Sequence, residues 1–283
     1  MTVAHYENFP VASWLCPPHI RQAVIAIYHF ARTADDIADE GDLQAPQRLE
    51  QLHVYRETLS RTLQGAAPDT NSPWAHIFRP LGQAHARHVL PKPLLDDLLD
   101  AFEQDVLNPM YACRAELLDY CRRSANPVGR LLLHLQGIRD PRLIAMSDQI
   151  CTALQLINFW QDLSVDVPRG RCYIPLSDAR AHGLPWPLRA TCGHDPRSVK
   201  ALVADLCQWA GQTMASGADL PMEVGGRMGL ELRLVVQGGL RVLEKIRLMD
   251  HQSFRHRPVL NAWDAPLLTW RAIRMRAAQA SKT

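Results

Sequence analysis

Two pairs of aspartates, each spaced four residues apart, are the features of this 283-residue sequence best suited to chemistry. Asp35 and Asp39 form the first pair, and Asp162 and Asp166 form the second. Residues four apart are neighbours on one face of an α-helix, so each pair places two carboxylates side by side. Two like charges ~4 Å apart repel by about 4 kcal/mol at an effective dielectric near 20. The pairs therefore predict a bound cation, and Mg²⁺ is favoured because it takes hard oxygen ligands and keeps water or phosphate in its remaining positions.

The first pair lies on a predicted amphipathic helix. Tyr28, Arg32, Asp35 and Asp39 follow one another at spacings of 4, 3 and 4 residues and form one stripe at the border of the apolar face. Asp36 is turned about 100° from Asp35, toward solvent. For this pair taken alone, the alternative is that both carboxylates lie on a solvated helix face and bind no ligand.

The second pair ends a segment that is apolar almost all round, and such a helix is expected to be buried. Gln155, Asn158, Asp162 and Asp166 nevertheless fall within one narrow arc of it. Burying two carboxylates is unfavourable unless something pairs with them. The second pair therefore favours a cation more strongly than the first.

Two arginines follow the second pair. Arg169 and Arg171 flank Gly170 a few residues after Asp166. Because a guanidinium binds phosphate through two parallel hydrogen bonds, the segment predicts contact with an anion. A diphosphate bridged by Mg²⁺ would complete the charge balance of this region.

Helical periodicity runs through most of the chain, and the period-2 runs typical of strands are nearly absent. The segment from 167 to 195 is rich in proline and glycine and is predicted to be a long loop, which ends where Asp195 caps a helix that Pro196 begins. The sequence predicts an all-α fold in a single domain over residues 1–283. The expected helices are 19–40, 46–64, 73–90, 93–107, 114–138, 142–167, 196–217, 222–249 and 263–278.

Composition limits the possible partners and compartment. Lys and Arg number 31 and Asp and Glu 29, a near balance that argues against binding to nucleic acid. The seven cysteines include no CxxC pair, which fits a reducing cytoplasm. No apolar run reaches the roughly 18 residues of a membrane span, and no secretory signal is evident. We expect a cytoplasmic protein.

The last predicted helix leaves two interpretations open. It mixes apolar residues with the basic residues Arg271, Arg274 and Arg276. Such a helix can rest peripherally on the anionic inner face of a bacterial membrane. It can equally be a packing helix with a solvated basic edge.

The motifs resemble those of the trans head-to-head prenyl synthases, the family of squalene and phytoene synthases. Asp35–Asp39 looks like the family's first aspartate-rich motif and Asn158–Asp166 like the second. Tyr120-Cys121 with Val128-Gly129 matches the ends of a mid-chain motif, and Gly170–Pro175 resembles the segment after the second motif. The similarity spans roughly residues 5–260. It implies a single-domain isoprenoid-synthase helical bundle around a central cavity, Mg²⁺, and a prenyl diphosphate substrate.

Two further segments resemble the hydroxysqualene synthase branch, which belongs to bacterial hopanoid biosynthesis. They are residues 5–13, which include Phe9, and residues 121–130, which include Asn126. Pro127 in the second of these predicts a kink in its helix. For this branch the resemblance implies conversion of presqualene diphosphate and water to hydroxysqualene and diphosphate without NADPH. Other enzymes of squalene synthesis would be its pathway partners.

The resemblance also implies a role for each matching residue. The metal ligands are Asp35, Asp39, Asp162 and Asp166. The catalytic residues are Tyr28, Arg32, Tyr120 and Asn158, and the substrate-binding residues are Gln155, Arg169, Arg171, Phe9 and Asn126.

Two departures from the family pattern indicate a changed first half-reaction. Many relatives carry Arg at the position of Gln161, and a Tyr in the late helix near Gly238-Gly239. The alternatives are a presqualene diphosphate, squalene or phytoene synthase that condenses two prenyl diphosphates, or a terpene cyclase. An alternative of another class is a non-catalytic helical binding protein stabilised by Mg²⁺.

Overall fold

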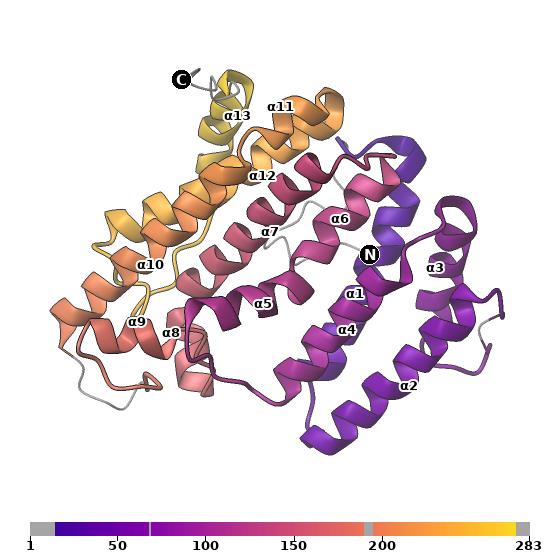
Figure 1. The fold of residues 1–283 in the computed structure, drawn as a ribbon, viewed down its shortest axis with the longest axis horizontal. Coiled ribbons are helices and arrows are strands. Elements are labelled where there is room, and N and C mark those ends of the chain that lie inside the picture. The colour runs from indigo at the N-terminus through magenta and orange to yellow at the C-terminus, as the bar shows by residue number, and fades with distance from the viewer. Residues whose placement is uncertain (1–14, 68, 190–194, 276–283) are drawn as a thin grey trace. The chain divides into compact units, whose positions relative to one another are not determined.

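A computed structural model describes residues 15–67, 69–189 and 195–275, and every regular element within these ranges is helical (Figure 1). The predicted all-α class is confirmed. Phe9 lies outside the described residues. The α-helices are α1 (Pro18–Asp39), α2 (Ala45–Leu63), α3 (Ala75–His88), α4 (Lys92–Val106), α5 (Arg114–Ser124), α6 (Asn126–Leu135), α7 (Pro141–Gln161), α8 (Leu163–Asp166), α9 (Leu176–Ala181), α10 (Pro196–Gly217), α11 (Leu220–Val224), α12 (Gly226–Leu248) and α13 (Ala265–Arg274), with 3-10 turns η1 (Val167–Arg169) and η2 (Ala262–Asp264).

Three of the predicted helices are interrupted. Pro127 lies in the first turn of α6, so the expected kink is a complete break between α5 and α6. Asp162 separates α7 from α8. Gly225 separates α11 from α12 with a φ of 62°, a conformation that favours glycine.

The segment 167–195 differs from the predicted loop. It contains η1 and α9, so only part of it is irregular. Its predicted end is confirmed, because the Asp195 carboxylate accepts a hydrogen bond of 3.0 Å from the amide of Ser198 in the first turn of α10.

The chain forms two compact units, which we describe separately. The N-terminal unit comprises the described residues up to 109 together with 122–144, and the C-terminal unit comprises 110–121 and the described residues from 145 onward. The chain passes between the units after residue 109, within α5 and within α7. A single domain over residues 1–283 stays a prediction.

In the N-terminal unit, α2, α3, α4 and α6 all pack on α1. The rings of Phe30 and Tyr55 stack with centroids 5.3 Å apart, and Tyr55 and Phe78 lie 4.7 Å apart. The hydroxyl of Tyr55 donates a hydrogen bond of 3.1 Å to the carbonyl of Phe30, so this buried polar group is satisfied. The helix that carries the first aspartate pair is therefore the one on which the other helices of this core pack.

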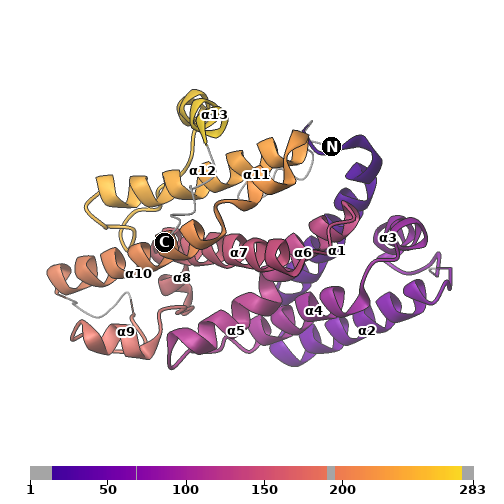
Figure 2. The same cartoon turned by 45° about the horizontal axis from the view of Figure 1, so that its top comes forward.

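In the C-terminal unit, α12 contacts α10, α11 and α13, and Figure 2 shows α13 on the side of α12 away from α10. A Cβ added at Gly239 would lie 3.0 Å from Leu154 and 3.1 Å from Met214, so the glycine lets α12 pack closely against α7 and α10. Gly217, at the end of α10, lies against the backbone of α7 at Met146. Small residues thus bring the helices of this unit close together.

Replacing Gly217 with Ala is expected to destabilise the protein. The new Cβ would overlap the carbonyl oxygen of Met146, and overpacking of this kind costs about 1–3 kcal/mol. Gly211→Ala in the same helix is the control, because its Cβ would meet only Leu243 at 3.7 Å. That variant should be neutral or gain up to about 1 kcal/mol in helix propensity. Urea unfolding measures both, and equal effects would contradict the close contact.

Asp264 joins η2 to α12. Its side chain is 5% exposed and accepts hydrogen bonds from Arg241 Nε at 2.8 Å and Lys245 Nζ at 2.5 Å. The backbone amide of Asn261 donates a third, at 2.9 Å. Burial by itself raises the pKa of Asp264, but these donors outweigh it and lower the pKa to about 2.

This pKa predicts a pH-dependent contribution to stability. Because the pKa of Asp264 is lowered on folding, its contribution is complete above the unfolded value near 4 and is lost as the pH falls toward 2. Asp264→Asn should lower the free energy of unfolding by about 2 kcal/mol at pH 6, and the difference from the unmodified protein should shrink between pH 4 and pH 2. Asp250→Asn, which removes an exposed pair with Lys200, should change little. Urea unfolding as a function of pH measures this, and a pH-independent difference would contradict it.

Candidate active site

The first aspartate motif is charge-balanced by its own helix. Arg32 contacts Asp35 at 2.9 Å, Asp36 at 2.6 Å and Glu40 at 2.8 Å. Asp36, predicted to turn toward solvent, has a side chain that is 40% exposed and also pairs with Arg32, because the long guanidinium side chain reaches carboxylates three, four and eight residues further on. Burial by itself lowers the pKa of Arg32, but the three carboxylates outweigh it and raise the pKa. Burial also raises the pKa of Asp36, in spite of its bond to Arg32.

The other predicted residues of the first motif are less enclosed. Asp39 is exposed and is the last residue of α1, and Tyr28 is half-buried with its ring edge against His29. Asn126 belongs to the same unit and is 7% exposed at the start of α6. The structure therefore brings Tyr28, Arg32, Asp35 and Asp39 onto one helix, as predicted.

A residue that the sequence analysis missed fixes the end of this helix. Arg48 of α2 is 9% exposed and donates to four backbone carbonyls at or just beyond the end of α1. The distances are 2.9 Å to Ile37, 2.7 Å to Glu40, 2.7 Å to Gly41 and 2.9 Å to Leu43. A cation here satisfies carbonyls that a helix end leaves without partners and complements its negative dipole end. Arg48 thereby positions the turn that carries Asp39.

Arg48→Met should destabilise the N-terminal unit, because it keeps the apolar stem and leaves several carbonyls without a donor. Each buried group left unsatisfied costs about 1–3 kcal/mol, and we expect a total loss of about 2–4 kcal/mol. Arg61→Met at the exposed end of the same helix is the control and should change stability by less than about 0.5 kcal/mol. Urea unfolding compares the two, and similar losses would show that the carbonyl contacts contribute nothing.

The second aspartate motif lies where α7 gives way to α8. Gln155, Asn158, Asp162 and Asp166 are all partly exposed, while the neighbouring apolar residues Leu156, Ile157, Phe159, Trp160 and Leu163 are buried. The backbone amide of Asp162 still donates to the carbonyl of Asn158 at 2.9 Å, and the backbone amide of Asp166 donates to the carbonyl of Asp162 at 2.9 Å. Asn158, Asp162 and Asp166 therefore keep the four-residue spacing of a helical backbone although the helix is not continuous, and the predicted arc that also includes Gln155 stays a prediction.

The break has a tertiary cause. The backbone amide of Ser164 donates to the carbonyl of Ser253 at 3.1 Å. Ser253 lies beyond the end of α12. Gln161, which is 8% exposed, donates through Nε2 to the carbonyl of Pro258 at 2.7 Å. Two hydrogen bonds therefore hold the segment from Ser253 to Pro258 along the second motif. We call residues 253–258 the C-terminal strap.

The C-terminal strap delivers a cation to the second motif. Arg257 contacts Asp162, with Nε 2.5 Å from Oδ1 and Nη2 3.4 Å from Oδ2. Arg257 lies 95 residues further along the chain, so spacing alone could not pair it with Asp162. In the sequence, the only signal for this cation is a short basic stretch. It follows the end of α12 and stops just before Pro258.

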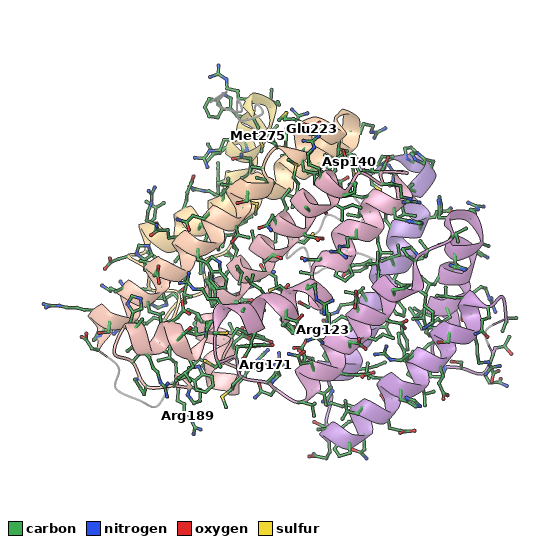
Figure 3. The ribbon with its side chains drawn as sticks, in the orientation of Figure 1. Arg123, Asp140, Arg171, Arg189, Glu223 and Met275 are labelled. Atoms are coloured by element: carbon green, nitrogen blue, oxygen red, sulfur yellow. The ribbon has the colours of Figure 1, made fainter. Side chains whose placement is uncertain are left out.

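A glycine turn places the two arginines that follow the second pair. Gly170 has a φ of 80°, its amide bonds to Val167, and the amide of Arg171 bonds back to the carbonyl of Asp166 at 3.0 Å. These are the paired hydrogen bonds of a glycine helix terminus. Arg169 is exposed and Arg171 is half-buried, and Figure 3 shows Arg171 in the segment after α8. The backbone of Arg171 is thus tied directly to the second motif.

Tyr120 belongs to an aromatic cluster beside the second motif. Tyr173 stacks on Phe159 with ring centroids 3.9 Å apart, and Tyr120 lies 6.2 Å from both rings. Tyr111 completes the cluster, 5.8 Å from Tyr120. Tyr120 is 3% exposed. Stacking of Tyr173 therefore holds the segment after the second motif against α7.

Comparison with known proteins places this arrangement in a family. The family description "squalene/phytoene synthase" matches residues 2–264. The hydroxysqualene synthase of Rhodopseudomonas palustris is 34% identical over 88% of this chain and 82% of its own length. The presqualene diphosphate synthase of the same organism is 32% identical over 61% of this chain and 60% of its own length. A solved structure, squalene synthase HpnC from Alicyclobacillus acidocaldarius, has a TM-score of 0.77 and 34% identity over 87% of this chain and 90% of its own.

The fold is the all-α isoprenoid-synthase fold of prenyl-transferring enzymes. The chain belongs to the squalene/phytoene synthase family. No helix in the part of the chain that the structure describes combines the length and the apolar character needed to cross a bilayer.

Proposed function

We propose that this protein converts presqualene diphosphate and water to hydroxysqualene and diphosphate. The observation that carries the proposal is the similarity to the hydroxysqualene synthase of Rhodopseudomonas palustris, which covers 88% of this chain. In that organism the name presqualene diphosphate synthase belongs to a separate relative. A prenyl-coupling enzyme of that kind would supply the substrate, and this protein would act next.

The donors of the two motifs suit Mg²⁺. Within residues 15–67, 69–189 and 195–275, no three His, Cys, Asp or Glu side chains converge as a metal site. Mg²⁺ does not require one, since it binds through one or two carboxylates together with phosphate oxygens and water. Each pair would hold Mg²⁺ through its own carboxylates, Asp35 with Asp39 in one unit and Asp162 with Asp166 in the other, and the amide oxygens of Gln155 and Asn158 would assist the second pair. Bound Mg²⁺ supplies positive charge that stabilises the leaving diphosphate.

The arginines of each motif would bind the diphosphate directly. Arg32, Arg169 and Arg171 offer planar donor pairs that match phosphate oxygens. In the structure Arg32 is held by carboxylates of its own helix, so its guanidinium is already oriented along the motif. Tyr28, one turn before Arg32, adds a hydroxyl donor. Arg257 keeps Asp162 charge-balanced.

The aromatic cluster would serve the cation that forms when the diphosphate leaves. The carbon–oxygen bond breaks with its electron pair going to the diphosphate, and the positive charge stays on the hydrocarbon. The electron-rich faces of Tyr120, Phe159 and Tyr173 attract positive charge. Water then forms the new carbon–oxygen bond and loses a proton. Because water ends the reaction, no reductant such as NADPH is consumed.

A second candidate function is the synthesis of presqualene diphosphate from two prenyl diphosphates. It is favoured by the 32% identity to the presqualene diphosphate synthase of Rhodopseudomonas palustris. The two activities differ in their substrates, so a direct assay separates them.

Purified protein with Mg²⁺ and presqualene diphosphate, without NADPH, should form hydroxysqualene, detected by mass spectrometry. Asp162→Asn and Asp166→Asn should each lower kcat at least about 100-fold, because a charged group that stabilises the transition state is lost. Asp195→Asn is the control, since Asn caps a helix as well as Asp. Circular dichroism should show unchanged helicity in all three variants.

Three outcomes would overturn parts of this proposal. Turnover of farnesyl diphosphate alone, with presqualene diphosphate left unchanged, would favour the second candidate. Full activity of Asp162→Asn would refute the assignment of the metal ligands. Binding of the substrate with no product would indicate a non-catalytic protein.

A further inference from the structure

Helix α13 is docked through one face only. Its inner face is anchored on α12, where Arg271 contacts Glu244 at 2.6 Å and Arg233 donates to the carbonyl of Ala272 at 3.3 Å. Ala272 is fully buried. This anchoring fixes the direction in which the opposite face of α13 points.

The opposite face is apolar, aromatic and uncovered. Trp263, just before α13, is 90% exposed, Trp270 is 54% exposed and Ile273 is 66% exposed. Trp270 and Ile273 are one turn apart on the helix, and Trp263 lies in η2, the turn that leads directly into α13. We call Trp263, Trp270 and Ile273 the outer face of α13. Large side chains at this exposure are unfavourable in water unless another apolar surface covers them.

In the sequence of α13 and of the residues after it, every charged side chain is positive. Residues 265–283 include Arg271, Arg274, Arg276 and Lys282 and no acidic residue. The guanidinium of Arg274 lies 5.0 Å from the ring centre of Trp270. The nearby acids are already paired, Asp264 with Arg241 and Lys245 and Glu244 with Arg241 and Arg271. Because Arg271 is paired with Glu244, Arg274 is the described arginine of α13 that places its positive charge beside an indole ring of the outer face.

We propose that the outer face of α13 docks on an anionic lipid bilayer. Tryptophan is favoured at a membrane interface, where its ring meets acyl chains and its N–H meets head groups. Arginines beside it attract anionic head groups. Figure 3 marks Met275, the last described residue, after which Arg276 and Lys282 extend the basic sequence. This docking does not depend on the reaction, so either proposal can fail alone.

Vesicle binding tests the proposal. The full chain should sediment with vesicles of phosphatidylglycerol and phosphatidylcholine, and much less with phosphatidylcholine alone. Trp263→Ser combined with Trp270→Ser should lower the partition coefficient about tenfold or more. Arg274→Gln should weaken binding only to the phosphatidylglycerol vesicles. Brominated lipids should quench part of the tryptophan fluorescence of the unmodified protein.

Matched controls distinguish binding through the outer face of α13 from nonspecific hydrophobic binding to vesicles. Leu107→Ser combined with Leu248→Ser removes two exposed leucines elsewhere, 66% and 71% exposed, and should leave binding unchanged. The tryptophan double variant should keep full turnover of substrate presented in detergent. Failure of the unmodified protein to bind anionic vesicles would overturn the proposal. So would a dimer, seen by analytical ultracentrifugation, that the tryptophan double variant abolishes.

Discussion

The aspartates of both motifs stand beside arginines, and the rest of each unit depends on this charge balance. A carboxylate pair on a helix repels itself, and partial burial increases the penalty. On α1, Arg32 of the same helix offsets this repulsion by pairing with the carboxylates. At the end of α7, Arg257 of the C-terminal strap has the same effect because it pairs with Asp162. Both motifs can thus fold before any ligand arrives, because the charge of each is already balanced by an arginine.

Local sequence determined much of this arrangement. Periodicity predicted the helix type of nearly every element, and the Asp195–Pro196 signal gave the start of α10 correctly. The arc of Asn158 and Asp162 also followed from helical geometry alone. What periodicity could not show is the break at Asp162, because its cause is the bond from Ser164 to Ser253. Interactions between segments about ninety residues apart leave no trace in a window of one or two turns.

The two departures from the family pattern have structural consequences. Gln161 donates to the carbonyl of Pro258, so an uncharged side chain here helps to secure the strap that carries Arg257. Gly239 stands where a Cβ would lie 3.0 Å from Leu154. A large side chain at this position would force α12 away from α7. Both residues therefore belong to the framework of the second motif.

The proposed reaction forms an apolar product, and docking on a bilayer through the outer face of α13 would ease its release. Burying an apolar chain of ~30 carbons at about 0.8 kcal/mol per CH₂ binds the hydrocarbon product tightly and makes its release into water slow. A bilayer surrounds the same chain with an equally apolar medium, so transfer to lipid removes most of that penalty. Trp270 is exposed on a helix that is anchored to α12 by Arg271 and Arg233, and Trp263 is exposed in the turn just before that helix. Docking through them would keep the enzyme at the medium into which its product dissolves, without inserting a helix into it.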